Sequence, residues 1–241
     1  MDAFSVAGVG MQDDLQRMNS ISQNLANVTT TAYKREIAVS RPFFDHVDQL
    51  RGAGNIGSNP ARASAPITDM THGILRHTGN PLDIAIEGDG YFEVSTEKGL
   101  LYTRRGSLHI DTRGRLVTED GNALMGVSGE LVISGTTAQI DRNGEVREGD
   151  RVMGQIKLVR FSNPQALASI ANGMFSQGSA RLADAGADGN IRAGYLENSN
   201  VNSPQEMVRL TETVRHFEAM QKIMQGYDDA FEKAMHKLGD F

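Results

Sequence analysis

Two apolar stripes with helical spacing, one near each end of the chain, constrain its fold more than any other feature of the sequence. The C-terminal stripe is the longer one, and its large apolar residues recur at steps of three or four, which lines one face of an α-helix. Its members are Met207, Leu210, Val214, Phe217, Met220, Met224, Tyr227, Phe231, Met235 and Leu238. A helix from Pro204 to Leu238 would be about 50 Å long at about 1.5 Å per residue. Such a rod exceeds the width of a small domain, so part of its apolar face needs cover from other molecules.

The N-terminal stripe predicts a shorter helix, from Phe4 to Val28. Its large apolar residues have the same spacing and are Met11, Leu15, Met18, Ile21, Leu25 and Val28. At the other end of the chain, Ser203 to Glu206 fits a capping box with Pro204 at the first helical position. We predict that the two helices pair with each other and then pack against copies from other molecules. Both sets of apolar residues are therefore the candidate subunit interface.

Between the two helices, from about residue 73 to residue 193, the pattern changes to short apolar runs separated by turns. Gly88–Gly90, Asp120–Gly121 and Asn143–Gly144 are strong turn signals. One small unit occurs twice, at Asp111–Leu116 and at Asp141–Val146. We interpret both copies as tight turns, because they lack the carboxylates of a calcium-binding loop. The predicted strands cover residues 84–86, 91–94, 108–110, 116–117, 131–133 and 156–161.

The order of these patterns predicts an α+β fold, in which long N- and C-terminal helices pair as a coiled-coil-like layer and the middle of the chain forms a mostly antiparallel β domain. Small residues dominate positions 51–66, as is typical of a loop or linker. We expect four segments: an N-terminal helix in residues 1–35, a linker or extended segment in 36–72, the β domain in 73–193 and the C-terminal helix in 194–241.

Charge and composition exclude several classes of protein. The chain has 24 Lys and Arg against 30 Asp and Glu, a net charge of −6, whereas nucleic-acid binding needs clustered basic residues. It contains no cysteine, which removes disulfides and thiolate metal sites. No segment approaches the roughly 18 consecutive apolar residues of a membrane span. The first residues lack the basic leader and apolar core of a cleaved signal peptide, so we expect no such cleavage.

The sequence offers little chemistry. It contains no phosphate-binding loop, zinc-binding helix or nucleophile elbow, and its six histidines lack the tight spacing of metal ligands. Asp83 and Glu87 would share one face of a strand and could form an acid/base set with Asp89, but turn and edge carboxylates are far commoner. We therefore predict no enzyme and no catalytic, cofactor or metal site.

At the end of the predicted first helix, the run from Ser22 to Arg35 resembles a motif of bacterial flagellar axial proteins, the rod and hook components. The pattern of that family is close to S-x-N-L-A-N-x-x-T-x-G-[FY]-K. The residues that match it are Asn24, Leu25, Ala26, Asn27, Thr30, Tyr33 and Lys34. Ala32 departs from the pattern, because the family has at this position a glycine, the residue that most readily adopts a positive φ.

Two further blocks resemble the same family. Residues 78–92, continued by 102–106 and 111–117, are similar to the central β domain of the rod and hook proteins, and residues 194–202 to the segment that opens their C-terminal helix. The blocks occur in the order of the family and span nearly the whole chain. Within the family, Arg215–Glu218 followed by Gln221–Lys222 is more similar to the proximal than to the distal rod type, and the compact length agrees.

The resemblance implies a structural subunit of the flagellar basal-body rod, exported without a cleaved signal through the flagellar type III export apparatus to the periplasm-spanning rod. It implies that the terminal helices assemble helically with other copies and with neighbouring rod proteins, and so transmit motor torque to the hook and filament. A distal rod or other axial component stays open as an alternative, as does a transient rod-binding adaptor. The weakest alternative is a periplasmic cell-wall-acting enzyme with Asp83 or Asp89 as its acid.

Overall fold

The computed structural model describes residues 3–39, 66–135, 138–183 and 190–239. Most of the expected small-residue linker at 51–66 lies outside the described residues. The chain divides into two compact units, which we call the helix unit and the β unit. The helix unit comprises Met1–Ala26, Glu36–Ile67 and Asn202–Phe241, and the β unit Asn27–Arg35 and Thr68–Val201. Residues 27–35, expected as the end of the N-terminal helical segment, thus group with the strands.

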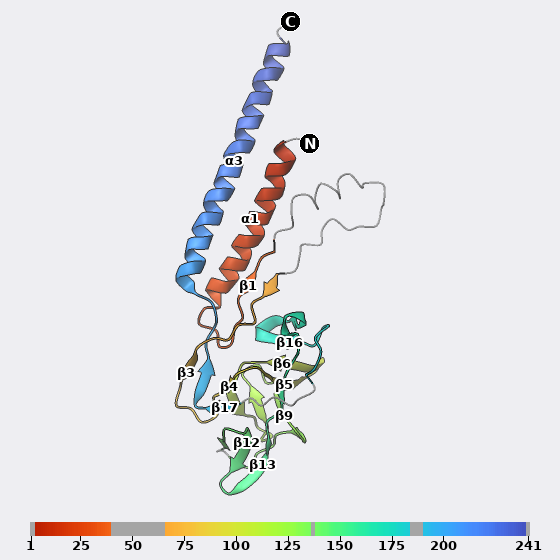
Figure 1. The fold of residues 1–241 in the computed structure, drawn as a ribbon, viewed down its shortest axis with the longest axis vertical. Helices are drawn as coiled ribbons and strands as arrows, with labels where there is room; N and C mark the ends of the chain where they lie inside the picture. The colour runs from red at the N-terminus through yellow and green to blue at the C-terminus, as the bar shows by residue number, and fades with distance from the viewer. Residues whose placement is uncertain (1–2, 40–65, 136–137, 184–189, 240–241) are drawn as a thin grey trace. The chain divides into compact units, whose positions relative to one another are not determined.

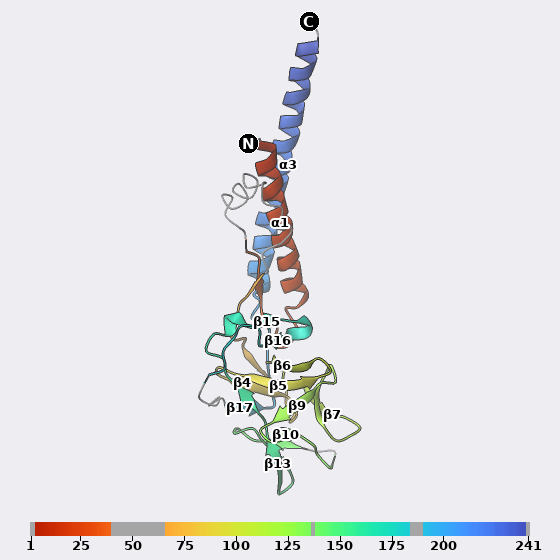
Figure 2. The same ribbon diagram turned by 90° about the vertical axis from the view of Figure 1, so that its right-hand side faces the viewer.

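The helix unit contains two long helices, α1 (Ala3–Ala26) and α3 (Ser203–Gly239), which lie side by side in Figures 1 and 2. Position 10 lies against Met220, Asp14 contacts His216, and Asn24 contacts Glu206, so the helices are antiparallel. Together with the antiparallel sheets of the β unit, this pairing confirms the predicted α+β fold. Because α3 has 37 residues and α1 has 24, α3 continues beyond the start of α1 (Figure 1).

The ends of the two helices differ from the expected ones in detail. The first helix ends at Ala26, two residues before Val28. The cap of α3 is Asn202 and not Ser203, because the Asn202 side-chain oxygen accepts the Gln205 backbone N–H at 3.2 Å and its carbonyl accepts the Glu206 N–H at 3.0 Å. The predicted capping box is therefore wrong, and the Glu206 carboxylate is instead buried, within 3.4 Å of the Asn24 side-chain amide.

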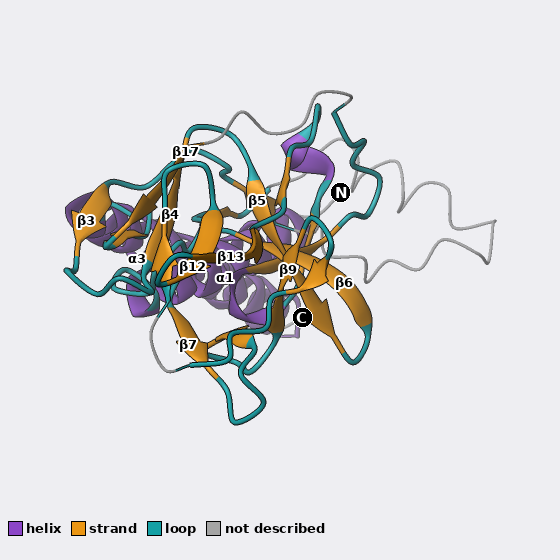
Figure 3. Ribbon diagram, turned by 90° about the horizontal axis from the view of Figure 1, so that it is seen from below, coloured by secondary structure: helices purple, strands orange, loops and turns teal. Residues whose placement is uncertain are grey.

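The β unit is built from short strands joined by tight turns (Figure 3). Its largest sheet has nine strands in the order β15-β16-β6-β5-β9-β8-β7, with β10 paired to β9 and β14 to β5. The strands of this sheet are β5 (Tyr91–Thr96), β6 (Gly99–Thr103), β7 (Leu108–Ile110), β8 (Leu116–Thr118), β9 (Ala123–Gly126), β10 (Gly129–Glu130), β14 (Leu158–Val159), β15 (Ala168–Ser169) and β16 (Met174–Ser176).

Smaller sheets complete the described strands. A three-stranded sheet contains β11 (Gln139–Ile140), β12 (Glu145–Glu148) and β13 (Arg151–Gln155), and β1 (Glu36–Ile37) pairs with β2 (Ile67–Thr68). The earliest and latest strands of the β unit pair with one another: β3 (Leu75–His77) with β18 (Tyr195–Glu197), and β4 (Ile84–Glu87) with β17 (Asn190–Ala193). Two short 3-10 helices, Pro164–Ala166 and Ala171–Gly173, lie among them.

The core of the β unit unites residues that are distant in the sequence. Phe92, Leu116, Val146 and Ile191 are all fully buried in one cluster. Since Ile191 belongs to the last part of the unit, its core is complete only when β17 is in place.

The repeated unit forms the same turn twice, as predicted. In the first copy the Asp111 side chain accepts the backbone N–H groups of Arg113 and Arg115, both at 2.8 Å. In the second copy the Asp141 side chain accepts two N–H groups in the same way, both at 2.9 Å. Gly114 and Gly144 have φ angles of 78° and 80°, which explains the glycine in each copy.

Other strand predictions were less accurate. Residues 131–133 form an isolated bridge at Val132 and not a strand. The expected strand at 156–161 is broken into bridges at Ile156 and Phe161 with β14 between them. The sequence prediction also omitted several short strands, among them β6, β9, β13 and β17, because runs of three to five residues are too short to display a clear alternation.

Candidate functional site

The predicted interface residues of α1 are only partly covered within the helix unit. Ile21 is buried, Met11, Met18 and Leu25 are half-buried, and Leu15 is exposed. Val28, also half-buried, lies in the turn that follows the helix.

On α3 the predicted interface residues fall into two groups. Those within the length of α1 that face it are half-buried, namely Leu210, Phe217, Met220 and Met224. The others are exposed, namely Met207, Val214, Tyr227, Phe231 and Met235. The side chain of Leu238 lies outside the described residues.

Three of these exposed apolar residues continue the part of the α3 stripe that faces α1. Tyr227, Phe231 and Met235 follow Met224 at steps of three or four, so they extend the same helix face. They are 52%, 69% and 59% exposed, because α3 there runs beyond the start of α1. We call these three residues the overhang stripe. Adjacent exposed apolar side chains of this size are typical of an interaction surface.

The motif residues after the apolar part of α1 form ordered contacts. The buried Asn24 side chain pairs with the backbone of Glu36 as a strand would, accepting its N–H and donating to its carbonyl, both at 2.8 Å. Asn27 and Thr30 make a turn, in which the Thr30 N–H donates to the Asn27 carbonyl at 3.1 Å. Ala26 is exposed and Tyr33 half-buried.

Ala32 occupies the position where the family has glycine, and it keeps a positive φ of 54°. Its side chain is buried, and its N–H donates to the Glu197 carbonyl at 2.8 Å. The turn thus persists with alanine in a conformation that L-residues adopt at a cost of about 1 kcal/mol or more.

The three sequence blocks that resemble the family meet at one buried carboxylate, Glu197. Its Oε1 accepts the Lys34 ammonium at 2.6 Å and the Gly73 backbone N–H at 2.8 Å. Its Oε2 accepts the Arg104 Nε–H at 2.6 Å. All three charged side chains are almost inaccessible to solvent. We call Lys34, Arg104 and Glu197 the Glu197 cluster.

Backbone carbonyls complete the hydrogen bonding of the two cations in this cluster. The Arg104 guanidinium donates to the carbonyls of Ile86, Gly88 and Gly90 at 2.7–3.2 Å, and the Lys34 ammonium donates to the Thr71 carbonyl at 2.7 Å. A buried ion pair is retained only when such additional bonds offset its desolvation.

Burial and charge act in opposite directions on these groups. Burial disfavours the ionised form of Glu197, but the charges of Arg104 and Lys34 and the hydrogen bonds of Lys34 and Gly73 outweigh it, so the pKa of Glu197 lies below its ordinary value. Burial lowers the pKa of Lys34, although the charge and hydrogen bond of Glu197 oppose this shift.

Asn200 holds the same segments together three residues further along. Its side-chain oxygen accepts the Arg35 N–H at 2.7 Å, and its amide donates to the carbonyls of Asp69 and Thr71 at 2.9 and 3.0 Å. The sequence blocks contain Arg104, Glu197 and Asn200, but sequence reasoning gave none of them a role.

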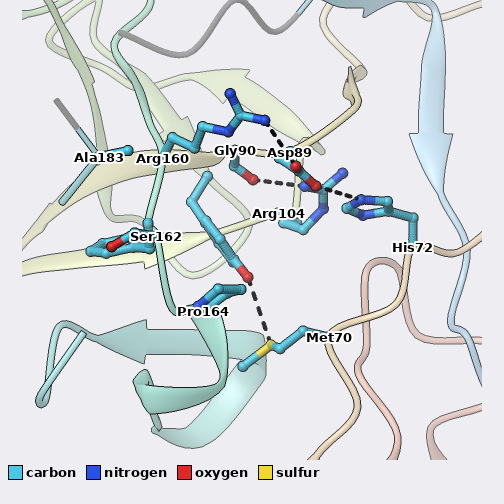
Figure 4. A pocket seen from close by; sticks show the side chains of 11 residues that line it. Met70, His72, Asp89, Gly90, Arg104, Arg160, Ser162, Pro164 and Ala183 are labelled. Carbon is cyan, nitrogen blue, oxygen red and sulfur yellow. Dashed lines mark hydrogen bonds and ion pairs between the residues drawn. The ribbon is translucent and has the colours of Figure 1, made fainter. Parts of the chain in front are cut away.

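The candidate acid/base residues are engaged in other contacts. Asp83 accepts the Asn80 side-chain amide at 3.0 Å, and Glu87 forms a two-bond ion pair with Arg192 at 2.8 and 2.9 Å. Asp89 lies in a pocket of about 430 Å³, between Arg160 at 3.0 Å and His72 at 3.1 Å (Figure 4). These two partners lower the pKa of Asp89, whereas a general acid needs a raised one.

The rest of this pocket is structural. The buried Tyr91 hydroxyl lies 3.7 Å from the Met70 sulfur, and burial raises the pKa of Tyr91 to about 12. Among the described residues, no group of three His, Asp or Glu side chains could hold a metal ion. Nor does any helix in the described ranges have the length and apolarity needed to cross a membrane.

Comparison with protein families gives two matches. The family described as "Flagellar hook protein FlgE/F/G D1 domain" matches residues 85–148, and "Flagellar basal body rod FlgEFG protein C-terminal" matches residues 192–236. The first match covers much of the β unit, and the second covers the end of β17, all of β18 and most of α3.

Individual relatives match over nearly the whole chain. The flagellar basal-body rod protein FlgG of Agrobacterium fabrum is 30% identical over 95% of this chain and 96% of its own length. FlgG of Bacillus subtilis is 29% identical over 94% and 95%. The rod protein FlgF of Caulobacter vibrioides is 28% identical over 99% of both chains.

Proposed function

The chain belongs to the flagellar hook and basal-body rod family, a structural and not an enzymatic family, and from this premise we propose that it is a proximal rod subunit that assembles helically through α1 and α3. Its partners are other copies of itself and neighbouring rod subunits. Its place is the periplasm-spanning rod, where it transmits torque to the hook and filament.

The overhang stripe is the observation that carries this proposal. Burying a large apolar side chain contributes about 1.5–3 kcal/mol, and Tyr227, Phe231 and Met235 leave this gain unrealised in the single chain. A contact between different faces of neighbouring copies that does not close into a ring generates a helical filament. Closely packed helices then resist shear, which is what a torque-bearing rod requires.

Assignment to the proximal rod rests on finer features. The run Arg215–Glu218 with Gln221–Lys222 and the compact length both favour it. We also propose export through the flagellar type III apparatus without signal cleavage, as family membership suggests; the intact N-terminal Met1 or Asp2 in purified rods would support it.

The main experiment replaces one residue of the overhang stripe. Phe231→Asp should abolish rod assembly and motility while leaving the free chain folded, because Phe231 is exposed there. Gln225→Asp is the matched control, since it adds the same charge at an exposed position on another face of α3. Motility in soft agar and electron microscopy of basal bodies give the readout, and normal motility of Phe231→Asp would overturn the proposed interface.

A second measurement separates a subunit from a transient adaptor. Mass spectrometry of purified, mature basal bodies should detect the chain as a stoichiometric component. Its absence there would favour the adaptor, and a position at the hook-proximal end in a cryo-electron map would favour the distal rod.

A further inference from the structure

The Glu197 cluster joins parts of the chain that are made at different times. Lys34 follows α1, Arg104 follows β6, and Glu197 is the last residue of β18. The longest of these links, between Lys34 and Glu197, spans 163 residues. The carboxylate of Glu197, near the C-terminal end of the β unit, therefore pairs with two cations that precede it in the chain.

The chain crosses between the two units at four places, and Glu197 or one of its hydrogen-bond partners lies within eight residues of each crossing in the sequence. The crossings follow residues 26, 35, 67 and 201. Glu197 binds Ala32 and Lys34 between the first two crossings, and Gly73 shortly after the third. Glu197 itself lies four residues before the fourth crossing.

The two cations depend on Glu197 to different degrees. Arg104 retains three carbonyl partners without it, whereas Lys34 also donates to the Thr71 carbonyl. A buried ammonium without a counter-ion is strongly unfavourable. Without Glu197 in place, docking of residues 27–35 would bury the charge of Lys34 without its hydrogen-bonded counter-ion and with only the smaller electrostatic contribution of Asp69.

We propose that Glu197 is a completion lock, which docks residues 27–35, the segment directly after α1, only when the C-terminal strand β18 has joined the β unit. Residues 27–35 are then ordered in a complete chain and not docked in a chain whose β18 has not yet paired. Under the proposed function, on which this consequence rests, the lock limits assembly to subunits whose β unit is finished.

Hydrogen exchange of two backbone amides that bind Glu197 shows whether residues 27–35 are docked. The Ala32 N–H donates to the Glu197 carbonyl and the Gly73 N–H to its carboxylate. In the free, full-length Glu197→Gln chain, we expect hydrogen exchange of both amides to rise at least tenfold, because the new side-chain amide meets the Lys34 or Arg104 donors. The amide of Phe92 in the core should keep its protection.

Glu93→Gln is the matched control. Glu93 is also a buried carboxylate of the β unit, and its ion-pair partner, Lys157 at 2.8 Å, belongs to neither residues 27–35 nor β18. This variant should leave exchange at Ala32 and Gly73 within about twofold of the unmodified chain. Unchanged protection of both amides in Glu197→Gln would overturn the lock, and so would an equal rise throughout the β unit, since that would show general destabilisation.

Lys34→Met provides a second test if Glu197→Gln fails to fold. It removes one cation and leaves the pair of Arg104 and Glu197, so exchange should rise at Ala32 and stay low at Gly73. Protection of Ala32 in this variant would overturn the proposal. Because exchange is measured on the unassembled chain, these outcomes are independent of whether Phe231→Asp blocks rod assembly.

Discussion

The β unit and the helix unit place the same kind of side chain in opposite surroundings. Phe92 in β5 is 0% exposed, whereas Phe231 in α3 is 69% exposed. The β unit even buries the charged Glu197 cluster and provides each member with partners from its own segments. The core of the β unit thus satisfies its groups by itself, whereas the overhang stripe of the helix unit leaves three neighbouring large apolar side chains for other molecules to cover.

The largest expected difference in stability comes from replacing one phenylalanine in each unit with alanine. Phe92→Ala should lower the free energy of unfolding of the isolated chain by about 3–5 kcal/mol, because it opens a cavity in a closed core. Phe231→Ala should change it by less than about 0.5 kcal/mol. Urea unfolding followed by circular dichroism measures both values. A large cost for Phe231→Ala would show that the overhang stripe is covered within the single chain.

The next largest effects should come from two glycine substitutions, one in each unit, which should change the stability in opposite directions. Gly114→Ala should destabilise the β unit by at least about 1–2 kcal/mol, because alanine is unfavourable at positive φ and its Cβ would lie 2.3 Å from the Ile133 carbonyl oxygen. Gly226→Ala in α3 should instead stabilise the helix by about 0.5–1 kcal/mol, since its Cβ would meet nothing within 4 Å. Thermal unfolding of both variants gives the comparison.

Acid should destabilise the β unit by protonating Glu197. The folded chain holds the pKa of Glu197 below its ordinary value of 4.5, so the unfolded chain binds this proton more tightly. The stabilisation is therefore complete above about pH 4.5 and is lost as the pH falls through the depressed folded value. Urea unfolding between pH 6 and pH 3 should show a shallower acid slope for Glu197→Gln, and an equal slope would contradict this assignment.

The smallest expected effect concerns the strained turn at Ala32, in the segment of the β unit that follows α1. Ala32→Gly should stabilise the chain by no more than about 1 kcal/mol, because relief of the φ of 54° is partly offset by loss of a buried methyl group. Differential scanning calorimetry measures this change. A clear decrease in the melting temperature would show that packing of the methyl outweighs the backbone strain.

Periodicity was sufficient to predict the elements whose cause is local. The helical spacing of apolar residues predicted α1 and α3, and the repeated Asp-x-x-Gly unit predicted both tight turns. These patterns depend on neighbours within a few residues, so the sequence displays them directly. The capping box failed because Asn202, one residue earlier, is an equally good cap by its chemistry.

Pairings across long separations were not predictable in this way. The sequence shows Lys34, Arg104 and Glu197 as three charged residues in separate blocks, and nothing local indicates that they share one buried site. Similarly, the α3 stripe looks uniform in the sequence. Its division between Met224 and Tyr227 is decided by the length of α1, which is a property of another part of the chain.

The pairing of β3 with β18 and of β4 with β17 brings the entrance and exit of the β unit together. A module whose two ends are adjacent tolerates insertions, because the flanking chain needs no new span to bridge. The exposed turn at Gly149, between β12 and β13, could therefore be lengthened or carry a fluorescent reporter without altering where α1 and α3 attach.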